Sequence, residues 1–396
     1  MKPVVLISAV RTAGGSLGGS LRNVLPEELG QVVINGALLK TDFNKNLVDE
    51  VIIGQAKQTT DAPNLARVAA LKAGLPEEIP AYTVHRQCGS GLQAILNGVW
   101  QIQVGYSDIV IAGGVESMST APYYLRKVRF GLKAGNGELL DPNTESQPKS
   151  QPEEIYGRFN MGVTAENLAK LYKISREEQD EFAYMSQQKA IRAIDSGKFK
   201  DEIIPVTVRG KKEMIFEEDE FPRRDTTLER MKKLKTIFQE DGTVTAGNSS
   251  GRNDGAAAVV LMSEEKAKKL GLKPLARFVS AGITGVNPKI MGIGPAPATK
   301  QALARAGLEL DDIGLIELNE AFAAQSLAVI KELDMDEKKV NVNGGAIALG
   351  HPLGCSGTRI SVTLIHEMHK RSEKYGLATL CIAGGMGLAV IYENLS

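Results

Sequence analysis

The segment Tyr82-Thr-Val-His-Arg-Gln-Cys88-Gly-Ser-Gly-Leu-Gln-Ala-Ile-Leu96 places a cysteine where an extended stretch meets a helix. Tyr82–Val84 is typical of a short strand, and apolar residues recur at helical spacing from 92 to 99. The positive end of a helix lowers the pKa of a thiol below its ordinary value of about 8.5. Small residues after the sulfur leave backbone N–H groups accessible, which favours a thiolate that attacks a carbonyl. The alternative is a small buried cysteine with a packing role.

The sequence on either side of this segment predicts alternating strands and helices. Proline at position 26, followed by two acidic residues, is typical of the first turn of a helix, and Asn64–Ala73 is helical in composition. Alternation of this kind predicts an α/β protein with helices packed on the faces of a sheet. Strands are expected at Val4–Ala9, Val51–Gly54, Asp108–Ala112, Leu275–Ser280, Gly314–Leu318, Leu377–Ala383 and Leu388–Tyr392.

The two ends of the chain resemble each other, whereas the middle differs from both. Asp108-Ile-Val-Ile-Ala-Gly-Gly matches Leu380-Cys-Ile-Ala-Gly-Gly, and Val51-Ile-Ile-Gly parallels Leu315-Ile-Glu-Leu. On these residues alone, internal duplication and chance are equally good explanations. The middle is charged and loop-rich, and Thr164–Ala193 is expected to form helices with Glu and Gln on the exposed side. We interpret the middle as an inserted subdomain that covers a ligand.

Composition excludes several classes of protein. The chain has 396 residues, of which 47 are Lys or Arg and 47 are Asp or Glu, so no net charge favours nucleic acid or a membrane surface. No apolar run is long enough to cross a membrane, and the opening MKPVVLISAV is interpreted as a buried strand rather than a signal peptide. Three cysteines cannot all pair, which favours a reducing, cytoplasmic compartment.

Other candidate reactive residues follow Cys88 in the chain. His351 lies between glycine and proline in a turn, where it is free to take a proton from a thiol; a surface loop histidine is the alternative. Cys381 precedes a glycine turn, although a core cysteine is the commoner reading of that pattern. Asn319-Glu320 comes at the end of a predicted strand, the edge where α/β sheets bind ligands. Thr245-Ala-Gly-Asn-Ser-Ser-Gly251 offers backbone N–H groups and hydroxyls to a polar ligand.

Three further patterns carry less information about function. His366 and His369 share a helix face, but third and fourth metal ligands are not apparent, so we expect a solvated face and no metal. Cys355 is interpreted as a packed residue near His351. Gly113-Gly114 lacks the spacing of a nucleotide-binding fingerprint.

Together these segments resemble the thiolase family over essentially the whole chain. The resemblance implies a five-layered αβαβα fold of two similar halves with an inserted loop domain. It implies an N-terminal half at 1–116 and 246–270, a loop domain covering coenzyme A at 117–245, and a C-terminal half at 271–396. The matching motifs are Cys88-Gly-Ser-Gly, Ala112-Gly-Gly-Val-Glu-Ser-Met, Met161-Gly, Thr164-Ala-Glu-Asn, Thr245-Ala-Gly-Asn, Asn253-Asp-Gly-Ala-Ala, Met291-Gly-Ile-Gly-Pro, Asn319-Glu-Ala-Phe, Gly350-His-Pro-Leu-Gly and Cys381.

The resemblance also implies a role for each catalytic position. Cys88 would carry the acyl group, His351 would accept its proton, and Cys381 would remove or supply the proton at the α-carbon. One oxyanion hole would consist of His351 and a water held by Asn319. The other would consist of the backbone N–H groups of Cys88 and Ala383, where the family usually has glycine in place of Ala383.

Substrate-binding positions are carried over in the same way. Ser250 and Gly251 would lie near the pantetheine arm of coenzyme A, and Arg223 near its nucleotide end, unless Arg223 is simply solvated. Asn160 stands where the family usually has histidine. The acyl pocket would be lined by Met161, Met291 and Phe322, whose bulk would favour short acyl groups.

The resemblance therefore predicts an acetyl-CoA C-acetyltransferase, a cytoplasmic homodimer or homotetramer of fatty acid metabolism that acts on acyl-CoA and needs no permanently bound cofactor. A 3-ketoacyl-CoA thiolase with a deeper pocket is the nearest alternative. Decarboxylating condensing enzymes lack the second reactive cysteine, so Cys381 argues against them. A non-catalytic acyl-CoA-binding relative would be expected to have lost a reacting residue. The sequence does not choose the physiological direction, the acyl length or the number of subunits.

Overall fold

The computed structural model describes residues 1–41, 43–210 and 212–395. Its N-terminal strands form one part of a sheet in the order β4-β3-β5-β8-β1. β3 is parallel to β4 and β5, and β8 runs antiparallel to β5 and β1. Helices alternate with the first strands, as the sequence predicts. The elements are β1 Val4–Arg11, β2 Gly15–Ser16, α1 Pro26–Leu39, η1 Lys45–Leu47, β3 Glu50–Gly54, α2 Leu65–Lys72, β4 Ala81–Val84, α3 Ser90–Gln103, β5 Ile109–Ser117, β8 Asn253–Ser263 and α9 Glu264–Lys269.

The C-terminal strands continue the sheet in the order β10-β11-β12-β9. β10 and β11 are parallel, whereas β12 is antiparallel to both β11 and β9. β9 joins β1 through two residue pairs only. The elements are β9 Ala276–Gly285, η3 Pro288–Ile293, α10 Pro295–Ala306, η4 Leu310–Asp312, β10 Leu315–Leu318, α11 Ala323–Leu333, α12 Ala346–Leu349, α13 Leu353–Arg371, β11 Tyr375–Ile382 and β12 Met386–Asn394.

The two halves have the same topology. β1, β8, β5 and β3 in one half occupy the positions of β9, β12, β11 and β10 in the other. The sequence pairs noted above fall on β5 with β11 and on β3 with β10, so both are equivalent strands. Residue 340 even forms a parallel bridge to Ile316 where β4 pairs with β3 in the first half. The topology thus favours duplication over chance.

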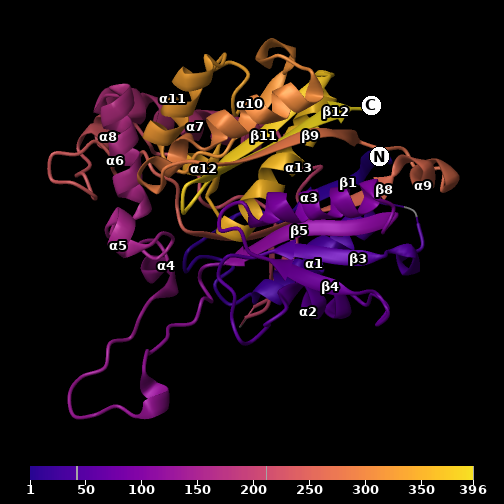
Figure 1. Ribbon diagram of the computed structural model, residues 1–396, viewed down its shortest axis with the longest axis horizontal. Helices are drawn as coiled ribbons and strands as arrows, with labels where there is room; N and C mark the ends of the chain where they lie inside the picture. The colour runs from indigo at the N-terminus through magenta and orange to yellow at the C-terminus, as the bar shows by residue number, and fades with distance from the viewer. Residues whose placement is uncertain (42, 211, 396) are drawn as a thin grey trace.

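Five layers result from this arrangement. α3 and α13 lie between the two parts of the sheet, with α1 and α2 covering one outer face and α10 and α11 covering the other (Figure 1). Three hydrophobic clusters fill the interfaces: one around α3 and α13, one beneath α1 and α2, and one beneath α10 and α11. The expected five-layered αβαβα fold is therefore observed. No helix within the described residues is long and apolar enough to cross a membrane.

Glycines allow the two central helices to meet at their N-terminal ends. A Cβ on Gly91 of α3 would lie 2.6 Å from the Thr358 hydroxyl of α13, and one on Gly357 would lie 2.6 Å from Leu92. A Cβ on Gly114 of β5 would lie 2.2 Å from the carbonyl oxygen of Gly354. Side chains at these positions would push α13 away from α3 and β5. The glycines thus bring together the segments that carry Cys88 and His351.

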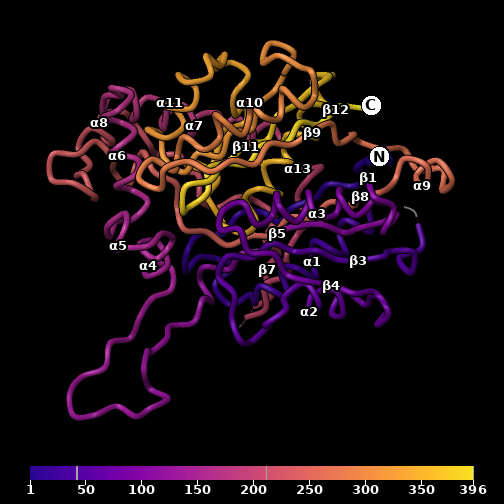
Figure 2. The backbone as a smooth tube through the Cα atoms, viewed as in Figure 1, coloured from indigo at the N-terminus to yellow at the C-terminus, as the bar shows by residue number. Residues whose placement is uncertain are grey.

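The middle of the chain forms a separate group of helices at one end of the layers (Figure 1). The segment between β5 and α4 projects away from the body as an extended arm, which the backbone trace shows clearly (Figure 2). The elements are η2 Val128–Phe130, α4 Pro142–Glu145, α5 Glu153–Tyr156, α6 Met161–Tyr172, α7 Arg176–Asp195, β6 Val206–Val208, β7 Met214–Phe216 and α8 Leu228–Lys232.

The expectation that Glu and Gln lie on the exposed side of these helices holds only in part. Glu177 and Glu181 are exposed, but Glu166, Gln179 and Gln187 are buried. Glu166 accepts hydrogen bonds from the backbone N–H groups of Thr243 and Val244, and Gln179 donates to the Thr243 hydroxyl at 2.8 Å. These side chains are inside because they satisfy the backbone of a neighbouring loop, which periodicity alone does not reveal.

Candidate active site

One cavity of about 480 Å³ brings most of the predicted site residues together. It lies between the central helices and the helices of the middle segment, and its volume suits a cofactor-sized ligand. Asn319 and Asn160 are the two predicted site residues outside its lining. The predicted residues that line it are Cys88, Met161, Arg223, Ser250, Gly251, Met291, Phe322, His351, Cys381 and Ala383.

Cys88 lies in a tight turn two residues before α3. Gln87 adopts a left-handed conformation with φ 48°, which is uncommon for a residue with a side chain. The Ser90 hydroxyl holds the turn by accepting from the Arg86 N–H at 2.8 Å and donating to the Gln87 carbonyl at 2.6 Å. The turn presents the sulfur to the cavity while α3 remains in the core.

The charge state of Cys88 differs from the expectation. Burial raises the pKa of its thiol, although the backbone N–H groups of Ala383 and Cys88 and the charge of Lys57 act in the opposite direction. The prediction that the helix end would lower the pKa is therefore wrong in this structure, because desolvation is the larger effect. Attack on a thioester then requires a base that removes the proton.

His351 has the geometry of such a base. It lies two residues before α13, and the Asn253 side chain accepts its backbone N–H at 3.0 Å. Its Nδ1 lies 2.6 Å from the Ser356 hydroxyl, and that hydroxyl donates its own proton to the Pro352 carbonyl at 2.8 Å. Ser356 must therefore accept from Nδ1–H, which leaves Nε2 without a proton. Burial, assisted by the charge of Arg359, lowers the pKa of His351 to about 3, so the ring is neutral at ordinary pH.

Cys381 lies near the end of β11 and packs against Met291 and Ala321. It is 2% exposed, and burial, together with the charge of Cys88, raises its pKa well above that of a free thiol. Cys88 and Cys381 both line the same cavity. Cys355 is also buried, but it belongs to the central hydrophobic cluster, as expected for a packed residue.

Two predicted residues lie next to the cavity rather than on it. Asn319 is 1% exposed at the end of β10, and neither its Oδ1 nor its Nδ2 has a hydrogen-bond partner among the described residues. Asn160 caps α6 by accepting from the Val163 N–H at 3.1 Å. Asn319 is thus a buried polar group with unused hydrogen-bonding capacity, and Asn160 has a clear role in helix structure.

Several other lining residues contact aromatic or apolar neighbours. The Arg223 guanidinium stacks over the Phe221 ring at 5.5 Å. Phe322 packs edge-on against Phe238, with ring centroids 6.1 Å apart. Met161 and Met291 join Phe322 in an apolar cluster around Cys381. The cavity lining is consequently cationic at Arg223 and apolar around Cys381.

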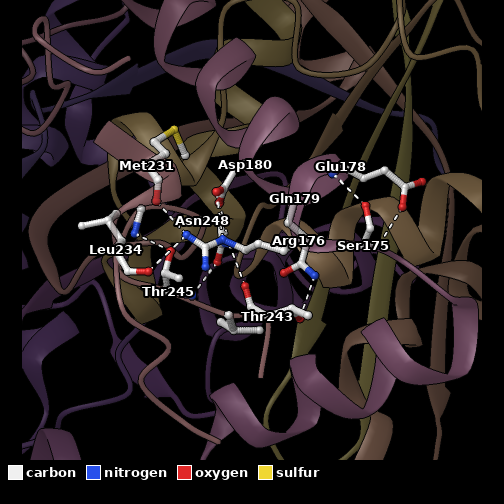
Figure 3. Close-up of polar contacts among 12 residues, drawn as sticks. Ser175, Arg176, Glu178, Gln179, Asp180, Met231, Leu234, Thr243, Thr245 and Asn248 are labelled. Atoms are coloured by element: carbon white, nitrogen blue, oxygen red, sulfur yellow. Dashed lines mark hydrogen bonds and ion pairs between the residues drawn. The ribbon is translucent and has the colours of Figure 1, made fainter. Parts of the chain in front are cut away.

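The loop that carries Ser250 and Gly251 is anchored by a buried network from α7 (Figure 3). Asp180 accepts from the Asn248 amide at 2.9 Å and from the Arg176 guanidinium at 2.8 Å. Asn248 in turn accepts from the Thr245 N–H at 2.8 Å. The network fixes the loop between the middle segment and the cavity.

Sequence reasoning missed several residues of the site. Lys57 lines the cavity after β3, and Glu116 accepts backbone hydrogen bonds from Ala56, Lys57 and Gly354. Glu116 therefore ties the loop after β3 to the start of α13. Its position after Gly113-Gly114 at a strand end was the available signal.

His366 and His369 were expected on a solvated helix face, and only His369 is exposed. His366 is partly buried, and its Nε2 lies 2.9 Å from the carbonyl oxygen of Ala9. In residues 1–41, 43–210 and 212–395, no group of three or more His, Cys, Asp or Glu side chains is arranged to hold a metal ion.

Comparison with known proteins identifies two domain matches. The thiolase N-terminal domain matches residues 4–265, and the thiolase C-terminal domain matches residues 272–394. An acetyl-CoA acetyltransferase from Pseudomonas aeruginosa is 52% identical over 392 residues, which cover 98% of this chain and 99% of that protein.

Solved structures agree with these matches. The Bacillus anthracis acetyl-CoA acetyltransferase superposes with a TM-score of 0.97 at 51% identity, covering 100% of this chain and 99% of that one. The human mitochondrial 3-ketoacyl-CoA thiolase in complex with CoA gives a TM-score of 0.95 at 46% identity, covering 100% and 98%.

Proposed function

Because the chain belongs to the thiolase family, we propose that it is an acetyl-CoA C-acetyltransferase. It would condense two acetyl-CoA molecules to acetoacetyl-CoA and CoA, and would catalyse the reverse thiolysis. The observation that carries the proposal is the meeting of Cys88, His351, Cys381 and Ala383 in one cavity. The acetyl-CoA acetyltransferases at about half identity over full length support the same activity.

The first half-reaction is acyl transfer to Cys88. Its sulfur attacks the thioester carbonyl while Nε2 of His351 takes the thiol proton, and CoA leaves with that proton. The neutral ring and its Nδ1 bond to Ser356 support this role. The N–H groups of Cys88 and Ala383 would stabilise the oxyanion, where losing one donor typically costs about 10²–10³ in rate.

The second half-reaction is carbon–carbon bond formation. Cys381 removes a proton from the α-carbon of the second acetyl-CoA, and the resulting carbanion attacks the acetyl-Cys88 carbonyl. The enolate oxygen would be stabilised by a water bound to Asn319, whose unused amide groups support this assignment, and by His351 in the tautomer that carries its proton on Nε2. The chain's own side chains and backbone supply every group needed, so the proposal requires no resident cofactor.

The proposal extends to the rest of the chain. Residues 117–245 would cover coenzyme A, with Ser250 and Gly251 at the pantetheine arm and Arg223 at the nucleotide end, which their positions along the cavity support. Asn160 would contribute by shaping the start of α6. We also propose a cytoplasmic homodimer or homotetramer of fatty acid metabolism; the three free cysteines support a reducing compartment.

A thiolysis assay across acyl lengths tests the proposal. Activity with acetoacetyl-CoA and free CoA is expected, with a decline as the 3-oxoacyl chain lengthens, because Met161, Met291 and Phe322 are bulky lining residues. A rate that rises with chain length would favour a 3-ketoacyl-CoA thiolase. Absence of CoA-dependent cleavage with every length would favour a non-catalytic acyl-CoA-binding protein.

A further inference from the structure

A buried lysine that the reaction above does not use lines the cavity beside the nucleophile. Lys57 follows β3 by three residues and is 6% exposed. Its Nζ donates to the Pro142 carbonyl at 3.1 Å and to the Ser146 hydroxyl, both from α4 and its C-terminal cap. Both partners are neutral, so the ammonium is held in place without a negative charge in contact.

The carboxylates nearest to Lys57 are already engaged. Glu116 accepts three backbone N–H groups, and Asp141 accepts from Asn143 and Thr144 and lies 3.6 Å from the Arg252 guanidinium. Among the residues that the structure describes, Lys57 forms no ion pair. A buried charge without an opposite partner is unfavourable, and burial accordingly lowers the pKa of Lys57.

The side chains around Lys57 are polar as well. This polar wall of the cavity contrasts with the apolar cluster of Met161, Met291 and Phe322. The amide of Gln87 donates to the Ser150 hydroxyl at 3.4 Å, which leaves its second N–H available. The methyl group of an acetyl group, or an alkyl chain, can form no hydrogen bond or ion pair with such a wall. The wall consists of Lys57, Gln87, Asn143, Ser146, Gln147 and Ser150.

We propose that Lys57 binds a carboxylate at the far end of the acyl group carried on Cys88, so that 3-oxoacyl-CoA thioesters of dicarboxylic acids are substrates. This inference rests on the proposed function, because it uses the same thiolysis at the same cysteine. The bond between C2 and C3 breaks, Cys381 gives its proton to C2, and acetyl-CoA departs. The carboxylated acyl group passes from Cys88 to the sulfur of free CoA, and no other reactant is needed.

The charge on Lys57 is well placed for this purpose. Lys57 and Cys88 interact electrostatically and line the same cavity. The acyl carbon would be bonded to the Cys88 sulfur, so a carboxylate two or three carbons further on would extend into the cavity that Lys57 lines. A charged hydrogen bond in this enclosed place discriminates strongly against an analogue without the carboxylate.

The test compares two substrates of equal length in the full-length protein. 3-Oxoadipoyl-CoA ends in a carboxylate, whereas 3-oxohexanoyl-CoA ends in a methyl group. We expect kcat/KM for thiolysis by free CoA to be about tenfold or more higher for the carboxylated substrate. A preference for the neutral substrate overturns the inference but leaves the proposed function intact, whereas cleavage of neither substrate nor of acetoacetyl-CoA overturns the proposed function.

Variants then assign the preference to Lys57. Lys57→Met is expected to lower kcat/KM for 3-oxoadipoyl-CoA by about 10- to 100-fold and to leave 3-oxohexanoyl-CoA within about threefold. Lys57→Arg should keep most of the preference. Lys149→Met is the matched control, because Lys149 follows α4, the helix that contacts Lys57, but pairs with Glu153 and does not line the cavity.

An equal loss on both substrates in Lys57→Met contradicts the inference, because it means that Lys57 acts on Cys88 and not on the acyl group. The neutral substrate reports whether the variant is folded and active. The comparison of the two substrates in the unaltered protein stands independently of any variant.

Discussion

The same Ala-Gly-Gly sequence lies within β5 in one half and directly after the equivalent strand β11 in the other, and the backbone follows different paths at these two places. In the N-terminal half, β5 continues through Gly113 and Gly114 to Ser117 and pairs with β8 along its whole length. In the C-terminal half, β11 stops at Ile382, and Gly384 and Gly385 turn the chain with φ values of 90° and 86°. The turn leaves the Ala383 N–H free to reach Cys88, whereas the straight strand extends to Glu116. Duplication thus preserved the topology, and local packing produced two different functional elements.

The reactive residues show the same division between the halves. Cys88 lies two residues before α3, and His351 lies two residues before α13, at equivalent places beside the central layer. Burial shifts their pKa values in opposite directions, so that both are uncharged before reaction. We infer that one half supplies the nucleophile and the other supplies the base and the second cysteine.

Removing the nucleophile should have the largest effect. Cys88→Ala is expected to lower the thiolysis rate by about 10⁴-fold or more and to abolish acyl-enzyme formation, because no other group takes the acyl chain. Intact-protein mass after incubation with acetyl-CoA measures the acyl adduct. The matched control is Cys355→Ala, which should still become acylated because Cys355 is a packed core residue. Labelling of Cys88→Ala at the native stoichiometry would show that the reactive sulfur lies elsewhere.

The second-largest effect is expected from disturbing the contact between β5 and the start of α13. In Gly114→Ala the new Cβ would lie 2.2 Å from the Gly354 carbonyl, so the start of α13 and the adjoining His351 must move. Kcat should fall about 100-fold, since a shift of about 1 Å has that effect on aligned reacting groups. The free energy of unfolding should fall by about 1–3 kcal/mol. Steady-state kinetics and urea unfolding measure the two quantities.

The control for this contact is Gly137→Ala in the projecting arm. Its Cβ would meet only side-chain atoms at 3.8 Å, so neither kcat nor stability should change. Native kcat in Gly114→Ala would mean that the position of α13 does not depend on β5.

The sequence predicted the fold, and most of the residues that it singled out line one cavity, but it missed what only packing determines. β8 was not predicted as a strand; the stretch from Asn253 was considered only as a motif. All eleven of its residues, Asn253–Ser263, are buried, so it shows neither the alternation of a half-exposed strand nor helical spacing. A central strand of this kind is recognised only once its neighbours are in place.

Charge states were the second thing the sequence did not reveal. A helix start beside Cys88 indicated a lowered pKa, but the direction depends on how deeply the neighbouring segments enclose the sulfur. Lys57 was overlooked for a similar reason. It follows a predicted strand as one cation among 47 basic residues, and only the folded chain places it in the cavity without an acidic partner in contact.

Removing the hydrogen bond between Ser356 and His351 should have a moderate effect on kcat. Ser356→Ala removes the hydroxyl that accepts Nδ1–H of His351, so the ring loses its preference for the tautomer with a free Nε2. We expect kcat to fall about tenfold with KM nearly unchanged. Ser361→Ala is the control, because its hydroxyl donates to the Gly357 carbonyl on the same helix and accepts from the Tyr392 hydroxyl, and neither contact involves His351. Equal losses in the two variants would assign Ser356 a purely structural role.

The smallest expected effect is a change in folding stability with pH. It should depend on His351 but not on Cys88. His351 has a pKa of about 3 in the folded chain, against 6.5 for an ordinary histidine, so the unfolded chain binds its proton first as pH falls. Its contribution to stability is therefore present above pH 6.5 and is lost progressively toward pH 3. Between pH 6.5 and 5.5, the stability advantage of the native protein over His351→Gln should shrink by about 1 kcal/mol, as measured by urea unfolding at both values. Cys88→Ser should show no such change, because the raised thiol pKa keeps Cys88 protonated in both states over this range. A difference between native protein and His351→Gln that is independent of pH would mean that the imidazole titrates alike in the folded and unfolded chain, which would contradict a neutral, buried His351.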